Sequence, residues 1–153
     1  LDAVKRDGVP YELITKALPT IEGEVNDILA QLVDFQILFD MDGKNINNYI
    51  VYDDDNTWPL ELSSGMERFI SSLAIRVGLI NVSNIPRSNF LAIDEGWGTM
   101  DSDNLNSVYS LFQYLKSQFQ FTLIVSHIDS MRDAVDTLLE IKKEKSFSSI
   151  NFD

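Results

Sequence analysis

The stretch FLAIDEGWGTMD, residues 90–101, contains an apolar run that ends in two adjacent carboxylates, Asp94 and Glu95. A short apolar run without alternation is typical of a buried strand. Charge at the end of a buried strand costs free energy unless a partner or a ligand uses it. The stretch therefore predicts a strand over residues 90–93, followed by an acidic pair that has a chemical use. An ordinary loop start is the alternative interpretation of the pair.

A second apolar run, FTLIVSH (residues 121–127), follows a stretch with helical spacing. The apolar positions of that helix are Leu105, Val108, Phe112, Leu115 and Phe119. Two such runs joined by a helix favour an α/β fold, in which helices cover parallel strands joined by a right-handed crossover. Ligands of such sheets bind at the carboxyl ends of the strands. If the two strands are neighbours, the acidic pair is expected to converge with Ser126 and His127.

The other apolar patterns predict three helices and two hairpins. The helices are expected over residues 21–33, 65–80 and 129–136. The hairpins are expected from residues 35–40 with 47–52, and from residues 137–144 with 146–153. Pro19 is expected to close the weak helical pattern before it, with Thr20 as the N-cap of the first helix. Asp42–Gly43 is a turn signal, and the acidic residues 53–56 predict a solvated loop.

Composition limits the classes of protein that the chain can belong to. Its 153 residues are 44% hydrophobic, which is enough for one domain with a real core. The absence of cysteine fits a reducing, intracellular setting. No apolar run approaches the roughly 20 residues of a membrane helix, and no signal peptide is visible, so we expect no membrane association. The chain begins with Leu1, as a processed or cloned piece of a longer protein would.

Net charge also bears on partners, because the formal value is −12 at pH 7. Binding to nucleic-acid phosphates relies on Lys and Arg. An acid-rich surface therefore argues against broad, nonspecific DNA affinity of this piece alone, although a local basic patch remains compatible with it.

Asp94, Glu95 and His127 together suit one half of a phosphoryl-transfer site. A carboxylate at a strand end can hold Mg²⁺, usually through water, because hard cations prefer oxygen ligands. A second carboxylate can deprotonate an attacking water, and a histidine can donate to a phosphate oxygen whose charge grows. Such residues would also serve a stand-alone, metal-dependent phosphohydrolase. The alternative for the single histidine is a hydrogen-bonded structural residue.

Ser63, Ser64 and Gly65 stand immediately before the helix expected over residues 65–80. A serine hydroxyl, backbone N–H groups beside a glycine and a helix N-terminus together make a phosphate site. The alternative is an ordinary N-cap without a ligand.

Several of these segments together resemble the motifs of ABC-type ATPases. LSSGMER (residues 62–68) resembles the signature motif, whose usual form is L-S-G-G-[QE]. FLAIDE (90–95) resembles the Walker B motif, and TMD, ending at Asp101, resembles the D-loop. LIVSHID (123–129) resembles the switch histidine segment. Each motif alone is weak, but their combination in this order is specific.

Two segments narrow the resemblance to the SbcC-type ATPases of DNA double-strand-break repair, which are related to SMC proteins. DEGWGTMD (94–101) is similar to the corresponding segment of that branch, and LPTIEGEVNDILAQL (18–32) resembles the region where its coiled coil re-enters the head. Bacteriophage recombination exonuclease subunits belong to the same branch. The implied function is an ATP-binding and ATP-hydrolysing subunit of a repair or recombination nuclease complex, in which ATP clamps two heads together. The alternative is a non-hydrolysing module for dimerisation or partner docking.

In such proteins the head consists of two lobes separated by a long antiparallel coiled coil, and the N-terminal lobe carries the P-loop. This chain has no G-x-x-x-x-G-K-[ST], because Gly43-Lys44 is followed by Asn45. We therefore expect residues 1–153 to be the C-terminal lobe, with the coiled-coil exit at 1–33 and an α/β lobe at 34–153. The implied cofactors are ATP and Mg²⁺. The implied partners are the P-loop lobe, a second head, an SbcD-type nuclease subunit and double-stranded DNA.

The resemblance also implies residue roles within the site. Asp94 would help to position Mg²⁺ through water, and Glu95 would be the general base. His127 would contact the γ-phosphate, and Asp101 would bridge the interface between two heads.

The signature segment carries the roles that act across that interface, and it also departs from the usual pattern. By the resemblance, Ser63 and the Gly65 backbone would contact the γ-phosphate of ATP held on the opposite head. Ser64 replaces the usual first glycine, which would cost about 1 kcal/mol if the position needs φ > 0. Met66 replaces Gln or Glu, so a polar contact made there would be lost.

Overall fold

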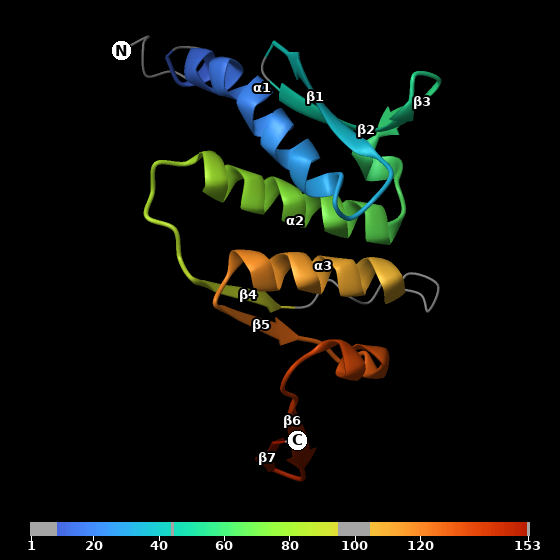
Figure 1. The fold of residues 1–153 in the computed structure, drawn as a ribbon, viewed down its shortest axis with the longest axis vertical. Helices are drawn as coiled ribbons and strands as arrows, with labels where there is room; N and C mark the ends of the chain where they lie inside the picture. Colours follow the sequence, from blue (N-terminus) through green and yellow to red (C-terminus); the bar gives the residue numbers. More distant parts are fainter. Residues whose placement is uncertain (1–8, 44, 95–104, 153) are drawn as a thin grey trace. The chain divides into compact units, whose positions relative to one another are not determined.

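The computed structural model describes residues 9–43, 45–94 and 105–152 of the chain (Figure 1). These residues form two compact units that divide between Asn89 and Phe90. The first unit holds two helices and an antiparallel sheet, and the second holds a parallel strand pair, a helix and a hairpin. The expected α/β class is confirmed. None of the described helices combines the length and the apolar character needed to cross a membrane.

The first unit contains α1 (Val9–Leu29), β1 (Gln36–Asp42), β2 (Asn45–Asp53), β3 (Asn56–Pro59), the short 3₁₀ helix η2 (Leu60–Leu62) and α2 (Gly65–Val82). The second unit contains β4 (Phe90–Asp94), α3 (Leu105–Gln118), β5 (Phe121–Val125), the 3₁₀ helix η5 (Asp129–Ala134), β6 (Leu139–Glu144) and β7 (Phe147–Phe152).

Helix α1 differs from its expected form, because it runs through Pro19 and ends at Leu29 rather than at residue 33. The expected N-cap at Thr20 is therefore wrong. A proline inside a helix removes a backbone hydrogen bond and costs about 3 kcal/mol. Here the proline is exposed, and apolar residues on both sides of it are buried. Burial of this continuous apolar face offsets the cost; its members are Leu18, Val25, Ile28 and Leu29.

The sheet of the first unit has the order β1-β2-β3, and all its pairings are antiparallel. The predicted hairpin is confirmed, with Gly43 at φ 56 in its turn. The third strand was not predicted, because residues 53–56 were expected to form only a solvated loop. They form the turn into β3, where the Asp53 carboxylate accepts hydrogen bonds from the N–H groups of Asp55 and Asn56, both at 3.0 Å.

Side chains of α1 bond to the outer edge of β1. The Asn26 amide nitrogen donates to the Ile37 carbonyl at 2.9 Å, and the Ile37 N–H donates back to the Asn26 amide oxygen at 2.8 Å. The Phe39 N–H donates to the Glu22 carboxylate at 2.8 Å. The helix therefore supplies the hydrogen bonds that a further strand would make, which protects this edge from pairing with another chain.

Helices α1 and α2 approach closely at Gly78, which is buried in α2. A Cβ atom at this position would lie 2.9 Å from Cγ2 of Val25, itself fully buried in α1. Nearby, the Asn81 amide donates to the Glu24 carboxylate at 2.5 Å. The absence of a side chain at residue 78 therefore sets the distance between the two helices.

In the second unit, β4 and β5 pair in parallel, in a register that runs from Phe90–Phe121 to Asp94–Val125. Helix α3 connects them and packs on β5 (Figure 1). The predicted pair of neighbouring parallel strands is confirmed.

The expectation that these strands are buried on both faces is wrong for this chain. Burial alternates along β5, and the exposed positions of the two strands share one face. Its large apolar side chains are 45–58% exposed; they are Phe90, Phe121, Leu123 and Val125. The Phe90 and Phe121 rings stack at 5.5 Å. This sheet thus has one face against its own helix and one apolar face open.

The C-terminal hairpin is confirmed as β6 and β7, whereas the short helix expected over residues 129–136 is the 3₁₀ helix η5. Arg132 of η5 contacts the Glu140 carboxylate at 2.8 Å, and Lys142 contacts the same carboxylate at 2.9 Å. Lys116 of α3 contacts Asp136 at 2.7 Å. These exposed ion pairs link η5 to β6, and α3 to the segment between η5 and β6.

The contact at Gly78 generates a stability prediction. Gly78→Ala should lower the free energy of unfolding by about 1–3 kcal/mol, because the added methyl group overpacks against the stiff Val25 side chain. The matched control is Gly23→Ala on α1, where an added Cβ meets nothing within 4 Å. That change should stabilise the protein by up to about 1 kcal/mol. Urea unfolding measures both values, and equal effects of the two substitutions would contradict the proposed close contact.

Candidate functional site

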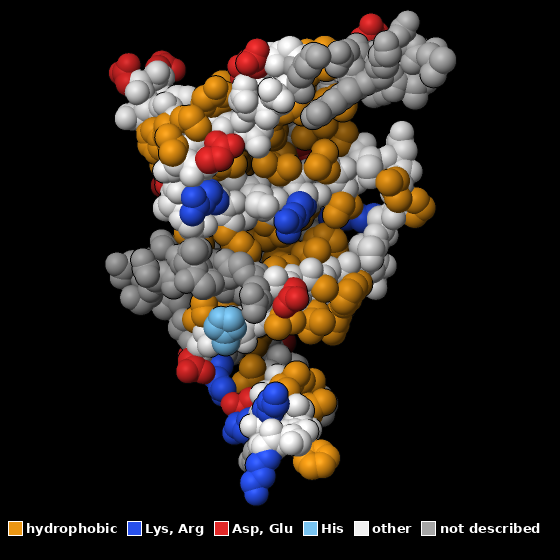
Figure 2. Space-filling model, turned by 180° about the vertical axis from the view of Figure 1, so that it is seen from behind, with side chains coloured by type: hydrophobic (Ala, Val, Ile, Leu, Met, Phe, Trp, Pro, Cys, Tyr) orange, Lys and Arg blue, Asp and Glu red, His pale blue; other side chains and the backbone are white. Residues whose placement is uncertain are grey.

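The carboxyl edge of the β4–β5 pair brings two polar segments together. Asp94 is the last residue of β4 and stands in register with Val125, the last residue of β5. Ser126 and His127 follow directly, so both polar segments lie at the same edge of the strand pair, as the parallel arrangement predicted. Asp94 and His127 are exposed, and the single histidine is visible at the surface in Figure 2. Glu95 and Asp101, the other two residues predicted for this region, lie outside the described residues.

The two residues that follow β5 differ in how their side chains are used. The Ser126 hydroxyl donates to the Met131 sulfur at 3.2 Å and accepts the Ile128 N–H at 3.1 Å, so it shapes the turn into η5. The His127 ring is exposed, and no described residue bonds to it. Its exposure is unlike the buried environment of a structural histidine, and it leaves the ring able to contact a ligand.

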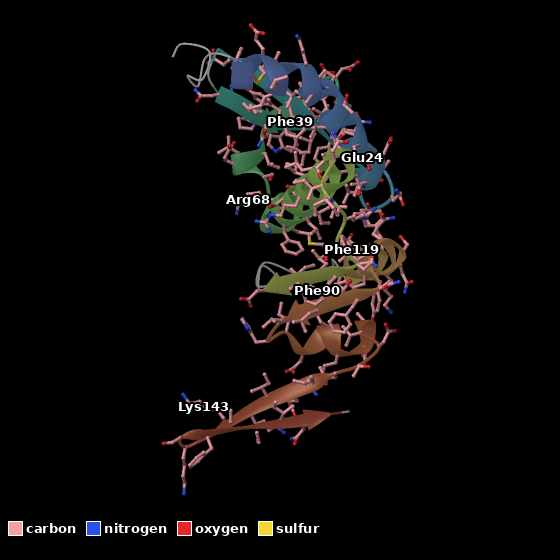
Figure 3. The ribbon with its side chains drawn as sticks, turned by 90° about the vertical axis from the view of Figure 1, so that its left-hand side faces the viewer. Glu24, Phe39, Arg68, Phe90, Phe119 and Lys143 are labelled. Carbon is pink, nitrogen blue, oxygen red and sulfur yellow. The ribbon has the colours of Figure 1, made fainter. Side chains whose placement is uncertain are left out.

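The N-terminus of α2 is the second candidate segment, and Arg68 marks this end of the helix in Figure 3. Ser64 is the N-cap: the Glu67 N–H donates to its hydroxyl at 3.3 Å, and the Ser64 N–H donates to the Glu67 carboxylate at 2.6 Å. This reciprocal pair is a capping box. In the part of the chain that the structure describes, the N–H groups of Gly65 and Met66 have no acceptor. Two amides and the proton of the Ser64 hydroxyl are therefore available to an anion.

The local geometry bears on three expectations about the signature segment. Ser64 has φ −63 and ψ 161, a conformation that any residue adopts, so the expected cost of serine at this position does not arise. The Met66 side chain is buried in the core, which agrees with the expected loss of a polar contact at this position. The Ser63 hydroxyl is buried and donates to the Leu60 carbonyl at 2.7 Å, whereas Ser64 is exposed. Of the two serines, Ser64 presents its hydroxyl to solvent.

Sequence reasoning missed two residues at this end of α2, Glu67 and Tyr52. The Tyr52 hydroxyl donates to Oε1 of Glu67 at 2.5 Å, while Oε2 accepts the Ser64 N–H. The sequence did carry a signal for Glu67, because S-x-x-E before an apolar run is the pattern of a capping box. It carried none for Tyr52, whose position depends on how β2 lies against the helix.

The environment shifts the pKa values of this pair in opposite directions. Partial burial, followed by the hydrogen bond to Glu67 and the charge of its carboxylate, raises the pKa of Tyr52 to about 12. Partial burial also acts to raise the pKa of Glu67, but hydrogen bonds from Tyr52 and Ser64 outweigh it and hold that pKa below its usual range. At neutral pH the pair is therefore a neutral donor and a carboxylate acceptor.

The donors and acceptors of both segments fit the ligands that the motifs imply. An exposed carboxylate at a strand end, as at Asp94, is the oxygen ligand that Mg²⁺ prefers. Open amides and a hydroxyl at a helix N-terminus suit phosphate oxygens. Among the described residues, no group of three or more His, Cys, Asp or Glu side chains lies close enough to hold a metal ion on its own.

Comparisons with known proteins bear on the fold. No protein-family model matches the chain. It is 38% identical, over 94% of its length, to the uncharacterized protein R555 of Acanthamoeba polyphaga mimivirus, and covers 12% of that protein. It is 32% identical, over 58% of its length, to the SbcC protein of the SbcCD nuclease of Staphylococcus aureus, and covers 9% of it. The chain thus spans about a tenth of the length of these curated relatives.

Solved structures with the same fold come from SMC proteins. One, from a study of ATP-driven dimerization and DNA-stimulated activation of SMC ATPases, has a TM-score of 0.74 and 14% identity; the match covers 92% of this chain and 88% of that one. The SMC head domain from Thermotoga maritima has a TM-score of 0.62 and 21% identity, with coverage of 94% and 51%. The resemblance inferred from the motifs is confirmed: this chain has the fold of the C-terminal part of an SbcC/SMC-like ABC-type ATPase head.

Proposed function

We propose that this chain is the C-terminal lobe of an ATP-binding and ATP-hydrolysing head in a DNA double-strand-break repair or recombination nuclease complex. ATP clamps two such heads together, and hydrolysis switches their conformation. The observation that carries the proposal is the carboxyl edge of the β4–β5 pair, where Asp94 and the His127 segment meet. The similarity to the SbcC protein of the SbcCD nuclease supports a nuclease complex, and the SMC head fold supports a nucleotide-driven switch.

Three residues of this chain have separate roles in the proposed hydrolysis: Asp94, Glu95 and His127. The Asp94 carboxylate would hold Mg²⁺, and Glu95, the next residue, would take the proton of the attacking water as general base. His127 donates to a phosphate oxygen on which charge grows during transfer. When bound, Mg²⁺ would offset the negative charge of the phosphate groups.

The N-terminus of α2 serves the ATP of the opposite head. The Ser64 hydroxyl and the open amides of Gly65 and Met66 supply neutral donors to its γ-phosphate, and Asp101 bridges the interface. Ser63 supports this turn through its bond to Leu60. A complete site therefore needs a second copy of the head.

Open apolar surface on this chain supports the proposed P-loop lobe and coiled coil as partners. Parallel sheets are normally covered on both faces, whereas the β4–β5 pair has an open face that includes Phe121 and Leu123. The P-loop lobe of the same protein is the proposed cover. In the first half of α1, Leu13 and Ile14 are also exposed, as residues that face the returning helix of a coiled coil would be. An SbcD-type nuclease subunit and double-stranded DNA are the other proposed partners, and a complex that acts on cellular DNA would work inside the cell.

The test of this function is nucleotide-driven association of the assembled head. We would co-express the chain with the P-loop-bearing lobe, introduce Glu95→Gln, and measure mass by light scattering with and without Mg-ATP. The mass should double with nucleotide. Loss of the general base should lower hydrolysis by about 10²–10⁴-fold relative to the unsubstituted head. Full-rate turnover in the Glu95→Gln head would contradict the role given to Glu95.

Other outcomes of the same experiment identify the rival functions. Association without hydrolysis in the unsubstituted head would indicate a non-hydrolysing dimerisation module. Phosphohydrolase activity of this chain without any P-loop lobe would indicate a stand-alone enzyme that uses Asp94, Glu95 and His127. Failure of the two lobes to associate would refute the split head.

The role given to Ser64 can be tested separately with two substitutions, to Asp and to Asn. Both keep a residue that caps helices, but only Asp adds a negative charge. Asp and Asn both cap helices well, so Ser64→Asp and Ser64→Asn should each preserve α2. The aspartate carboxylate would stand where the phosphate is proposed to bind and repel it. We expect Ser64→Asp to abolish ATP-driven association and Ser64→Asn to retain most of it. Equal association of both variants, measured by light scattering, would show that no phosphate binds beside Ser64.

A further inference from the structure

We propose that Tyr52 is a positioning residue for the phosphate-binding end of α2, because its hydroxyl holds the Glu67 carboxylate away from the Gly65 and Met66 amides. This inference rests on the proposed function, in which those amides receive a phosphate. It assigns a role to the first hairpin, which lies outside all of the ATPase motifs.

Hydrogen bonds from two donors fix the side chain of Glu67. Its two carboxylate oxygens are bonded in different directions, one by the Tyr52 hydroxyl at 2.5 Å and the other by the Ser64 N–H at 2.6 Å. Two donors on two oxygens fix the plane and the rotamer of the carboxylate. Glu67 therefore closes the capping box, and its oxygens are not available to the two open amides.

Tyr52 is itself fixed by two aromatic neighbours. Its ring stacks on Trp58 of β3, with centroids 5.5 Å apart and planes at 26°. It also meets Phe35 at 5.6 Å and 57°. Phe35 is buried, whereas Tyr52 is 40% exposed. The ring is therefore held by the sheet, and the hydroxyl reaches α2 from a position that the helix does not determine.

The negative charge of Glu67 explains why its carboxylate needs the Tyr52 hydroxyl as a second donor beside the Ser64 N–H. Glu67 lies in the first turn of α2, where the helix attracts anions. An unrestrained carboxylate there would repel a bound phosphate and compete with it for the same N–H groups. The Tyr52 hydroxyl is protonated at neutral pH, because its pKa of about 12 lies far above 7, and the donor is therefore present under working conditions.

The experiment compares Tyr52→Phe with Tyr49→Phe in the assembled head. Phenylalanine keeps the ring stacking and removes only the hydroxyl. Tyr49 lies on the same strand, and its hydroxyl has no hydrogen-bond partner among the described residues, so it is the matched control. Tyr52→Phe should raise the ATP concentration for half-maximal head association, and the KM for ATP, about three- to tenfold. The turnover number at saturating ATP should stay within about twofold of the unsubstituted value. Tyr49→Phe should change none of these values.

A double-substitution cycle with Glu67→Gln separates positioning from packing. If Tyr52 acts through the carboxylate, its substitution should have a much smaller effect in the Glu67→Gln background. Equal losses in both backgrounds, an unchanged KM, or a fall in turnover number together with melting temperature would each overturn the inference. Absence of ATP-driven association in the unsubstituted head would instead refute the proposed function, on which the inference rests.

Discussion

The parallel pairing of β4 with β5 is the constraint on which the candidate catalytic edge depends. Asp94 and His127 are far apart in sequence and meet at one edge only because the two strands run in the same direction and end in register. A slip of one residue would turn Asp94 to the other face of the sheet. The stacked rings of Phe90 and Phe121 hold the register at the opposite end, while α3 packs on the covered face. The exposed Phe90 and Phe121 rings thus also help to fix the position of Asp94 at the other end of β4.

The end of α2 meets a different electrostatic problem, since the chain carries a net charge of −12. Its donors to the proposed phosphate are neutral: two amides of the helix N-terminus and one hydroxyl. Arg68 lies in the same turn, but its guanidinium donates to the Glu61 carbonyl at 3.0 Å. The negative charge of Glu67 is stabilised by hydrogen bonds from Tyr52 and Ser64. The N-terminus of α2 therefore combines Glu67, an acidic residue that stabilises the start of the helix, with N–H groups that are open to an anion.

The sequence predicted those parts of the fold that local pattern determines. Apolar runs gave β4 and β5, and helical spacing with Ser64-Gly65 gave the start of α2 correctly. The failures arose where distant packing decides the outcome. Burial of one long apolar face carried α1 through Pro19 against its local preference. The strand β3 is too short to be recognised by alternation of apolar and polar residues. Its Trp58 stacks on Tyr52 of β2, a contact that the local sequence does not reveal.

The candidate site shows the same division between local and distant causes. The residue types at the β4–β5 edge could be predicted, because strand ends and motif order depend on sequence alone. The choice between the hydroxyls of Ser63 and Ser64 could not, because it depends on the turn at η2, where the Leu60 carbonyl takes one of them. Tyr52 was invisible for a similar reason, since its partner lies on another element.

The departures from the usual signature motif become understandable once the side chains and the backbone are considered separately. The Met66 side chain enters the core, while its N–H remains at the open end of α2. Ser64 takes an extended conformation that needs no glycine, and its hydroxyl adds a donor beside the amides. Recognition of a phosphate by backbone N–H groups requires only that the helix begin at this point. A sequence can therefore depart from the motif at these positions and keep the anion site, provided that the capping box still forms.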